Sequence, residues 1–536
     1  MGIRDFFNYC LIGLILSGVS SPALSQAPGA SESAEGPGPL QQLAYIKATN
    51  TGAGDQFGTG GPLIGDAVAL SADGTTLAIG APFESSGTTG VNGPDDDDST
   101  FGAGAVYVFT LEGERWTQQA YIKASNTGLT DNFGFSVALS ANGDTLAVSA
   151  YFESSAATGI DGNQDDDSIP QAGAVYIFTR DGSTWSQQAY VKASNTDQAG
   201  QVDELTGGDQ FGFALTLSDD GNTLAVSAID EDSATAGING NQSDDSARSA
   251  GAVYLYVRDG SAWTQQAYIK PTNPGAGDYF GYSVSLTSDG NTLAVGAYDE
   301  DGSLAGSNQQ QDDDAAGTGA VYIFNRSRGD WQQTAYLKAA NAERGDSLGV
   351  AVAISADGTT LAASALDEDG ATTGVNSMPS PDRETDTSTG AVYVFARSGA
   401  AWSQQAYIKA SNTGQHDWFG SRLSLSGNGQ TLAVGAQLED SATRGINGAQ
   451  NDDTAQESGA VYLFARSGAT WTQTAYVKGS NTEAYDEFGS AIALDRNGAL
   501  MAVGARGEDS AATGINGDQA DNSAQESGAV YLFRLD

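Results

Sequence analysis

Acidic side chains gather in seven long loops of this 536-residue sequence, and these carboxylates are the groups best able to do chemistry. The loops hold 37 of the 67 Asp and Glu residues. One of them, from Glu231 to Asp245, has carboxylates at both ends with Asn, Ser and Gly between them. Ca²⁺ takes roughly six to eight oxygen ligands from carboxylates, amide carbonyls and backbone on such turn-rich loops. The loops are therefore candidate calcium sites.

The candidate metal ligands come from four of the seven loops. They are Glu231, Asp232, Asp244, Asp245, Asp299, Asp301, Asp312, Asp313, Glu439, Asp440, Asp452, Asp453, Glu508, Asp509 and Asp521. A second interpretation is that the loops are solvated surface that keeps an acidic protein soluble, because their spacing matches no standard calcium loop. Both interpretations stay open.

A candidate ligand-binding site lies at His416, Asp417 and Trp418, around the only histidine of the chain. Matching places in other repeats read Gly-Asp-Tyr or Gly-Asp-Gln. An exposed aromatic residue beside a polar pair is a typical binding hot spot. Neutral drift within one repeat is the alternative, and we favour it. Three insertions also break the repeat and could shape a single ligand site: Thr59 to Asp66, Asp197 to Gly207 and Ser377 to Glu384.

These residues are positioned by a repeat that occurs seven times. Its anchor, Gly-Ala-Val-Tyr, starts at Gly104, Gly173, Gly251, Gly319, Gly390, Gly459 and Gly528. Each repeat contains four short β-branched or aromatic-rich segments bounded by Gly, Asn, Asp and Ser, which is the pattern of β-strands. Examples are Phe133 to Ser140, Thr292 to Ala297, Gly390 to Phe395 and Gln404 to Ala410. We call the four strands a, b, c and d.

Seven repeats of four antiparallel strands predict an all-β, seven-bladed β-propeller. The chain ends directly after strand c of the last repeat, and a lone strand d, Leu43 to Lys47, stands at its beginning. We therefore expect the N-terminal strand to complete the last blade and close the ring without an open edge. The short a–b and c–d hairpins should lie on one face, and the long b–c and d–a loops on the other.

All seven lysines of the protein belong to an Ala-Tyr-x-Lys phrase in strand d: Lys47, Lys123, Lys192, Lys270, Lys338, Lys409 and Lys478. This placement indicates a structural role, with each ammonium facing carboxylates of the acidic loops and each stem packed beside Tyr. A sevenfold ligand-binding ring is the less favoured alternative. Six tryptophans fall once per c–d hairpin, which indicates packing rather than a carbohydrate platform.

The chain is not expected to be an enzyme. It has one His, and no Ser-His-Asp spacing or phosphate-binding Gly loop. Its acidic pairs are so frequent that no single pair stands out as a general acid and base. A hydrolase that uses carboxylates at the centre of the disc is a remote alternative.

Residues 1–25 resemble a signal peptide, with an apolar run from Tyr9 to Val19 and small residues at Ala23 to Ser25. Residues 26–42 read as a disordered Pro/Gly/Ser linker, and residues 43–536 as the propeller. The only cysteine, Cys10, lies in the leader. A net charge of −44 makes nucleic acids and anionic membranes poor partners. We expect a secreted, periplasmic or cell-surface protein without membrane insertion.

Phe57-Gly58 and Gly80-Ala81-Pro82, with their counterparts in later repeats, resemble the FG-GAP repeat of integrin α-subunits, in its secreted bacterial variety. The resemblance implies a seven-bladed propeller with an adhesion or ligand-binding role on the face of the b–c and d–a loops. A protein or glycan ligand is the implied partner; a structural or surface scaffold without a specific ligand is the alternative. The calcium loop that integrin-type repeats often carry between strands a and b is not carried over, because Ser71 to Gly74 has only one acid, Asp73.

Overall fold

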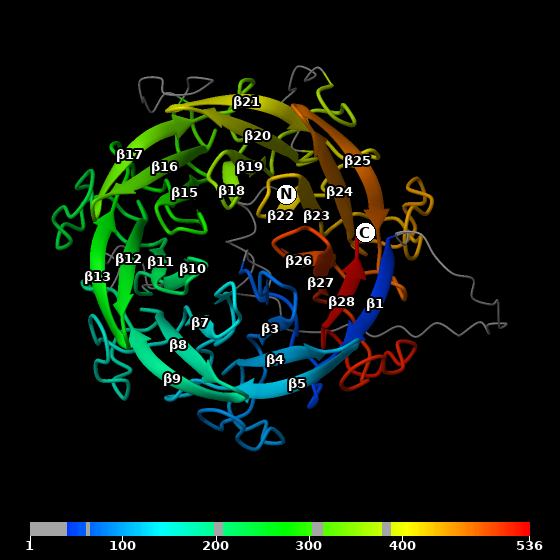
Figure 1. Ribbon diagram of the computed structural model, residues 1–536, viewed down its shortest axis with the longest axis horizontal. Helices are drawn as coiled ribbons and strands as arrows, with labels where there is room; N and C mark the ends of the chain where they lie inside the picture. The colour runs from blue at the N-terminus through cyan, green and yellow to red at the C-terminus, as the bar shows by residue number, and fades with distance from the viewer. Residues whose placement is uncertain (1–39, 61–64, 198–206, 303–314, 378–386, 536) are drawn as a thin grey trace.

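The computed structural model describes residues 40–60, 65–197, 207–302, 315–377 and 387–535. In these ranges the regular structure consists of β-strands, which form seven four-stranded antiparallel sheets around a common axis (Figure 1). The predicted seven-bladed propeller is confirmed. No helix in the described part of the chain has the length and hydrophobicity to cross a membrane. The predicted leader and most of the linker lie outside the described residues.

The first six blades take their four strands in chain order, from the axis outward (Figure 1). Blade 1 contains β2 (Val68–Leu70), β3 (Thr76–Ala81), β4 (Ala105–Glu112) and β5 (Arg115–Ile122). Blade 2 contains β6 (Val137–Leu139), β7 (Thr145–Ala150), β8 (Ala174–Asp181) and β9 (Thr184–Val191). Blade 3 contains β10 (Phe211–Leu217), β11 (Thr223–Ala228), β12 (Ala252–Asp259) and β13 (Ala262–Ile269).

The next three blades repeat this order. Blade 4 contains β14 (Ser283–Leu286), β15 (Thr292–Ala297), β16 (Ala320–Ser327) and β17 (Asp330–Leu337). Blade 5 contains β18 (Leu348–Ile354), β19 (Thr360–Ala365), β20 (Ala391–Ser398) and β21 (Ala401–Ile408). Blade 6 contains β22 (Phe419–Leu425), β23 (Thr431–Ala436), β24 (Ala460–Ser467) and β25 (Thr470–Val477).

Blade 7 joins the two ends of the chain. It consists of β26 (Phe488–Leu494), β27 (Leu500–Ala505), β28 (Ala529–Arg534) and, as its outer strand, β1 (Gln41–Ile46). Strand β1 pairs antiparallel with β28, and Tyr45 lies opposite Tyr531. The predicted closure is confirmed, and β1 begins two residues before the predicted start at Leu43. Pairing covers the edge of β28, which would otherwise be open to another chain.

The hydrophobic core lies between neighbouring blades, because side chains alternate between the two faces of each sheet. In β4, Val106 and Val108 belong to a buried cluster with Val148 and Phe178 of blade 2. Tyr107, between them, joins a different cluster with strands of blade 7. Each blade is therefore stabilised by both neighbours, as ring closure requires.

Two glycines of the repeat are required by a close crossing of backbones. Gly104, at the start of Gly-Ala-Val-Tyr, and Gly134, of Phe-Gly, have φ angles of 82° and 95°. A Cβ atom on Gly104 would lie 2.1 Å from the carbonyl oxygen of Phe133, and one on Gly134 would lie 2.5 Å from that of Ala105. The left-handed backbone and the contact together exclude any side chain. The two most recognisable phrases of the repeat therefore meet where blades 1 and 2 join.

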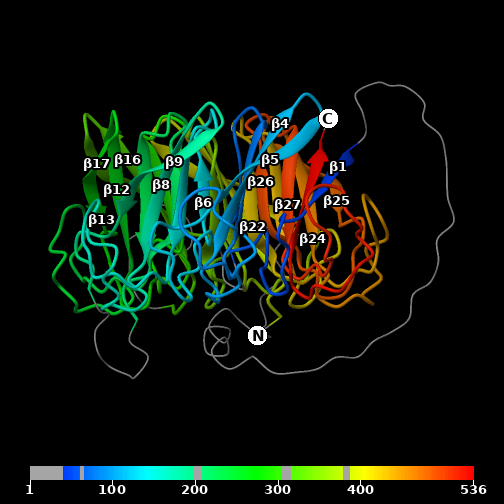
Figure 2. The same cartoon turned by 90° about the horizontal axis from the view of Figure 1, so that it is seen from below.

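The short hairpins and the long loops emerge on opposite faces of the disc, as predicted (Figure 2). We call the face with the b–c and d–a loops the loop face. On it, each d–a loop pairs with the b–c loop of the preceding blade; for example, the N–H groups of Asn132 and Phe133 donate to the carbonyl oxygens of Gly102 and Ala103, at 3.0 and 3.1 Å. This seam fixes the position of every residue on the loop face relative to its neighbours.

Candidate functional site

Every blade buries one lysine–glutamate ion pair beneath the loop face. The Nζ atom of the strand d lysine lies 2.6–2.9 Å from Oε2 of a glutamate in the b–c loop, and the lysine side chains are 0% exposed. The pairs are Lys47–Glu508, Lys123–Glu84, Lys192–Glu153, Lys270–Glu231, Lys338–Glu300, Lys409–Glu368 and Lys478–Glu439. The predicted structural role of the lysines is confirmed.

The glutamate of each pair has further donors. In blade 3, Oε1 of Glu231 accepts hydrogen bonds from the Tyr268 hydroxyl (2.5 Å) and from Nδ2 of Asn195 (3.3 Å), and Oε2 accepts one from the Ser233 N–H (3.1 Å) as well as from Lys270. Burial lowers the pKa of Lys270 and raises that of Tyr268. Protein donors therefore serve both oxygens of Glu231. Glu439 and Glu508, also predicted as metal ligands, have the same four kinds of donor.

The aspartate that follows each of these glutamates lies at the start of the b–c loop and accepts a backbone N–H from the end of the same loop. Oδ1 of Asp232, Asp440 and Asp509 accepts a backbone N–H from Ser249, Glu457 and Glu526, each at 2.7 Å. Asp301 does the same with the Gly317 N–H at 2.8 Å. Four more of the predicted metal ligands thus have a structural contact that shapes the b–c loop.

The remaining predicted ligands lie farther along the loops. Asp244 accepts hydrogen bonds from the Ala234 N–H and the Thr235 hydroxyl, at 3.2 and 3.1 Å. Asp245, Asp452 and Asp453 are exposed, Asp299 and Asp521 are half-buried, and Asp312 and Asp313 lie outside the described residues. Within the described ranges, no three His, Cys, Asp or Glu side chains form a group that could hold a metal ion.

His416, Asp417 and Trp418 are turned into the molecule. Trp418 is 7% exposed, so the expectation of an exposed aromatic residue is wrong. Asp417 is buried and accepts the Gly414 N–H at 2.9 Å. Burial, with Glu439 nearby, raises the pKa of Asp417 to about 8. His416 is half-buried, and its backbone N–H donates to the Thr387 carbonyl oxygen at 2.6 Å. The loop bends toward the axis, which is why a loop tryptophan becomes part of the core.

The residue before each Phe-Gly or Leu-Gly phrase differs from blade to blade, although its backbone does not. All seven have a left-handed backbone, with φ between 51° and 61°: Gln56, Asn132, Gln210, Tyr279, Ser347, Trp418 and Glu487. A left-handed backbone is costly for a residue with a side chain and clusters at functional sites. The same costly geometry carries glutamine twice and a different side chain in each of the other five blades.

Aromatic rings from blades 2 to 4 and 6 gather where these positions converge. Trp418 shares a buried cluster with Tyr151 of blade 2, Phe213 of blade 3 and Tyr298 of blade 4. Residues of four blades can share one cluster only near the axis. The rings of Tyr279 and Tyr298 are stacked, with centroids 5.4 Å apart and planes at 16°. Tyr279, at its edge, is half-buried.

Ionic side chains face this aromatic group from blades 6 and 7. Arg506 forms an ion pair with Glu487. Arg422 of β22 is 3% exposed and donates from Nη1 to the Ser421 carbonyl oxygen. Burial lowers the pKa of Arg422, and Asp66 of blade 1 and Tyr282 oppose that shift. We call the region formed by Tyr151, Tyr279, Tyr298, Trp418, Glu487 and Arg506 the axial mouth. Behind it, the inner strands of all seven blades line a channel of about 250 Å³.

The sequence analysis singled out only Trp418 of the axial mouth. Tyr279 and Glu487 occupy the matching position in other repeats, so a superposition of the seven repeats would have shown them together. Tyr151, Tyr298 and Arg506 directly follow strand b, where blade 1 has the proline of its Gly-Ala-Pro phrase. Their convergence depends on the ring geometry, which no spacing within a single repeat contains.

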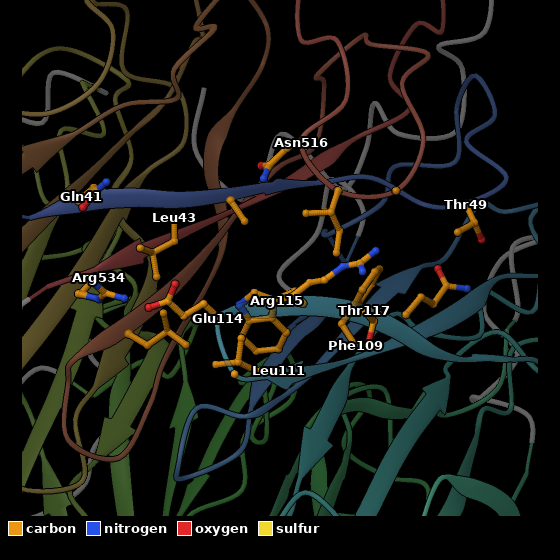
Figure 3. Close-up of a pocket in the computed structure, with 17 residues that line it drawn as sticks. Gln41, Leu43, Thr49, Phe109, Leu111, Glu114, Arg115, Thr117, Asn516 and Arg534 are labelled. Atoms are coloured by element: carbon orange, nitrogen blue, oxygen red, sulfur yellow. The ribbon is translucent and has the colours of Figure 1, made fainter. Parts of the chain in front are cut away.

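A second cavity opens at the outer rim, between blades 7 and 1. Its volume is about 780 Å³, and Leu43, Leu111 and Leu500 are among its lining residues (Figure 3). At the seam between blades 1 and 2 the matching residues are Gln119, Arg180 and Thr76. The Arg180 guanidinium donates hydrogen bonds to the Gln119 side-chain oxygen and to the Thr76 hydroxyl, both at 3.2 Å. There, Arg180 also stacks on Trp185, 5.3 Å from the ring centroid. The closing seam has exchanged this polar contact for three leucines.

Four segments of the chain match the model of the FG-GAP repeat: residues 116–178, 263–324, 402–464 and 471–533. The β-propeller domain of Myceliophteria thermophila Cps50 (Swd1) has 11% identity and a TM-score of 0.47, and the match covers 93% of this chain and 100% of that one. The periplasmic gluconolactonase of Pseudomonas aeruginosa has 14% identity and a TM-score of 0.43, with 78% and 86% covered. Comparison with curated proteins gave no match. The protein is a seven-bladed β-propeller, and four segments of its chain match the FG-GAP repeat.

Proposed function

We propose that this protein is a secreted ligand-binding module of the adhesion type, and that its ligand docks at the axial mouth. One observation carries the proposal: seven equivalent positions share a costly left-handed backbone, yet their side chains differ, and two of them, Tyr279 and Trp418, pack in one aromatic cluster. Packing within a blade does not require this variation, because every blade has the same strands around it. A ligand that binds once, on the axis, would contact each of the seven positions differently.

The charge of the loop face favours a protein ligand with exposed basic groups. In six blades the middle of the b–c loop reaches the outer strand, as the bridge between Ile238 and Ile269 shows. The acids of these loops give the loop face a negative potential that would attract a cationic partner and speed its association. Tyr279 offers a half-buried ring that can stack on an arginine or on a sugar. A glycan ligand would depend mainly on that stacking, and its binding would change little with salt.

The alternative is a surface scaffold without a specific ligand. Its support is that most predicted ligand carboxylates have structural contacts and that Trp418 is buried. The acidic loops would then serve solubility. An enzymatic role has no such support, since no acid pair of the axial mouth stands apart as a general acid and base.

Calcium binding by the b–c loops is a separate part of the proposal. Among the predicted ligands, the exposed Asp245, Asp452 and Asp453 are the carboxylates available to a cation in solution. If Ca²⁺ stiffens these loops, a chelator should lower the melting temperature. An unchanged midpoint would remove the metal from the b–c loops and leave the ligand proposal intact.

The repeat supplies substitutions that the fold already tolerates. Tyr279→Ser introduces the residue of blade 5, and Glu487→Gln that of blades 1 and 3. We expect the purified protein to bind members of an extracellular protein array or a glycan array, and both variants to weaken that binding at least about tenfold, as for loss of a hot-spot contact. Asp453→Asn, on the outer rim, is the matched control and should bind normally.

Melting curves must show that the variants fold like the wild type. A protein that retains nothing from either array would support the scaffold. Binding that survives both mouth substitutions but falls with Asp453→Asn would move the ligand to the outer loops.

A further inference from the structure

In six of the seven d–a loops, a buried aspartate accepts the same hydrogen bond. Two residues before each Phe-Gly or Leu-Gly phrase, an aspartate accepts on Oδ2 the backbone N–H of the residue three positions earlier, at 2.7–2.9 Å. The six are Asp55, Asp131, Asp278, Asp346, Asp417 and Asp486. They are 1–7% exposed. The hydrogen bond closes the turn and supports a carboxylate that has little contact with water.

Blade 3 breaks this pattern. Its aspartate, Asp209, is 1% exposed, and neither carboxylate oxygen accepts a hydrogen bond from an N–H or hydroxyl of the described residues. The predicted insertion from Asp197 to Gly207 enters the loop here, and residues 198–206 lie outside the described part. Asp197 follows Asn195 and Thr196, so it occupies the place of the residue whose N–H closes the turn elsewhere. In blade 3 the Asp197 N–H does not close the turn, although in blades 5 and 7 the N–H groups of Glu343 and Glu483, which are acids at the same position, do so.

The two carboxyl groups lie close enough to interact directly. Burial, followed by the charges of Asp197 and Glu231, raises the pKa of Asp209 well above its usual range. Burial raises the pKa of Asp197 to about 6; the interaction with Asp209 opposes this shift, and Asp245 and Glu231 add to it. Lys192 and Lys270, which interact with the Asp209 charge, are already paired with Glu153 and Glu231, each at 2.8 Å. Two ionised carboxylates in such a place are unstable unless a proton or a cation lies between them.

We infer that Asp197 and Asp209 of blade 3 bind one Ca²⁺ ion. Their four carboxylate oxygens supply part of the roughly six to eight that Ca²⁺ takes, and main-chain carbonyls or water complete the shell. Ca²⁺ tolerates such an irregular set, whereas Mg²⁺ demands a near-ideal octahedron. The site differs from the exposed acids of the b–c loops and does not depend on the proposed ligand.

The test uses the whole protein after chelation, titrated with CaCl₂ in a calorimeter at pH 7.5 and melted with and without Ca²⁺. We expect Asp209→Asn to bind one Ca²⁺ fewer per chain than the wild type and to lose the corresponding rise in melting temperature. Asp197→Asn, at a half-buried position that spares the core, should lose the same ion. The matched control is Asp131→Asn, because the Asp131 carboxylate already accepts the Gly128 N–H at 2.8 Å; it should keep the wild-type number of ions.

Two results would overturn the inference. In the first, both blade 3 variants bind as much Ca²⁺ as the wild type. In the second, Asp209→Asn raises the melting temperature without Ca²⁺ and the wild type gains nothing from the ion, which would show a shared proton instead. Failure of the ligand proposal would appear separately, in the array experiment, since Asp197 and Asp209 are not part of the axial mouth.

Discussion

The buried ion pairs and the axial mouth are built by the same seven repeats, yet one region is uniform and the other is not. Every blade has its lysine, its glutamate and a distance of 2.6–2.9 Å between them. At the mouth, one backbone geometry carries six different kinds of side chain. A feature that each blade needs in order to fold must be repeated, whereas a feature that the molecule needs once can differ. The contrast distinguishes a feature of the fold from the proposed binding site without any other sequence.

The largest effect should follow from breaking one of the uniform pairs. Glu439→Gln keeps the shape of the side chain but leaves the ammonium of Lys478 buried without its counter-charge, since both groups are nearly inaccessible to water. Loss of one partner of a buried pair costs about 3–5 kcal/mol. We therefore expect a large fall in the denaturation midpoint in urea.

Asp452→Asn is the control for this substitution. It removes an exposed acid of the same loop and should leave the midpoint unchanged. Adding Lys478→Met to Glu439→Gln should recover much of the lost stability, because an apolar residue needs no counter-charge. If Glu439→Gln and Asp452→Asn lowered the urea midpoint equally, the buried ion pairs would contribute no more to stability than the exposed acids of the loops.

The sequence predicted the ring and its closure well, because both follow from local patterns. The lone strand before Lys47 and the missing strand after β28 left one arrangement in which no edge stays open, and Tyr45 does pair with Tyr531. The structural role of the lysines could also be predicted, because a lysine that recurs once per repeat in the same strand is needed by every blade.

The partners across the loops were harder to predict. Glu231 was expected to bind Ca²⁺, but its partner Lys270 is 39 residues away, and loop spacing does not reveal which oxygens a distant strand already uses. Trp418 was expected to be exposed because it stands in a loop. Its loop runs toward the axis of the ring, where it joins a buried cluster with Tyr151, Phe213 and Tyr298. Both errors come from contacts that exist only after the ring has closed.

A smaller effect should appear in the pH dependence, through the aspartates of the d–a loops. Burial raises the pKa of Asp131 to about 7 and that of Asp486 to about 8 in the folded protein, above the ordinary value of 3.8. A raised pKa favours the protonated form on folding, so the contribution is complete below about pH 4 and is lost as the pH rises through 7 to 8. The melting temperature should therefore fall between about pH 4 and pH 8 and level off at higher pH.

The same series should be measured for Asp131→Asn and for the exposed Asp452→Asn at constant ionic strength. Each titrating proton contributes up to about 1.4 kcal/mol per pH unit. Asp131→Asn should flatten the curve by up to that amount, and the exposed control should not. A parallel shift of both variants would assign the pH dependence to general repulsion among the acidic loops instead.

The smallest effect on stability is expected at the closing seam between blades 7 and 1. This seam also departs from the repeat, so it tests whether any departure from the repeat marks a binding site. The triple variant Leu43→Gln, Leu111→Arg and Leu500→Thr restores the contact that Gln119, Arg180 and Thr76 make between blades 1 and 2. A partly exposed arginine stacked on tryptophan contributes about 0.5–1 kcal/mol, so stability should change by no more than about that amount. Ligand retention should stay the same, because the seam is on the outer rim and the mouth is on the axis.

The reverse variant, with leucines at Gln119, Arg180 and Thr76, should likewise leave retention unchanged. If the triple variant instead abolished ligand binding, the seam pocket and not the axial mouth would be where the protein departs from its repeat in order to bind.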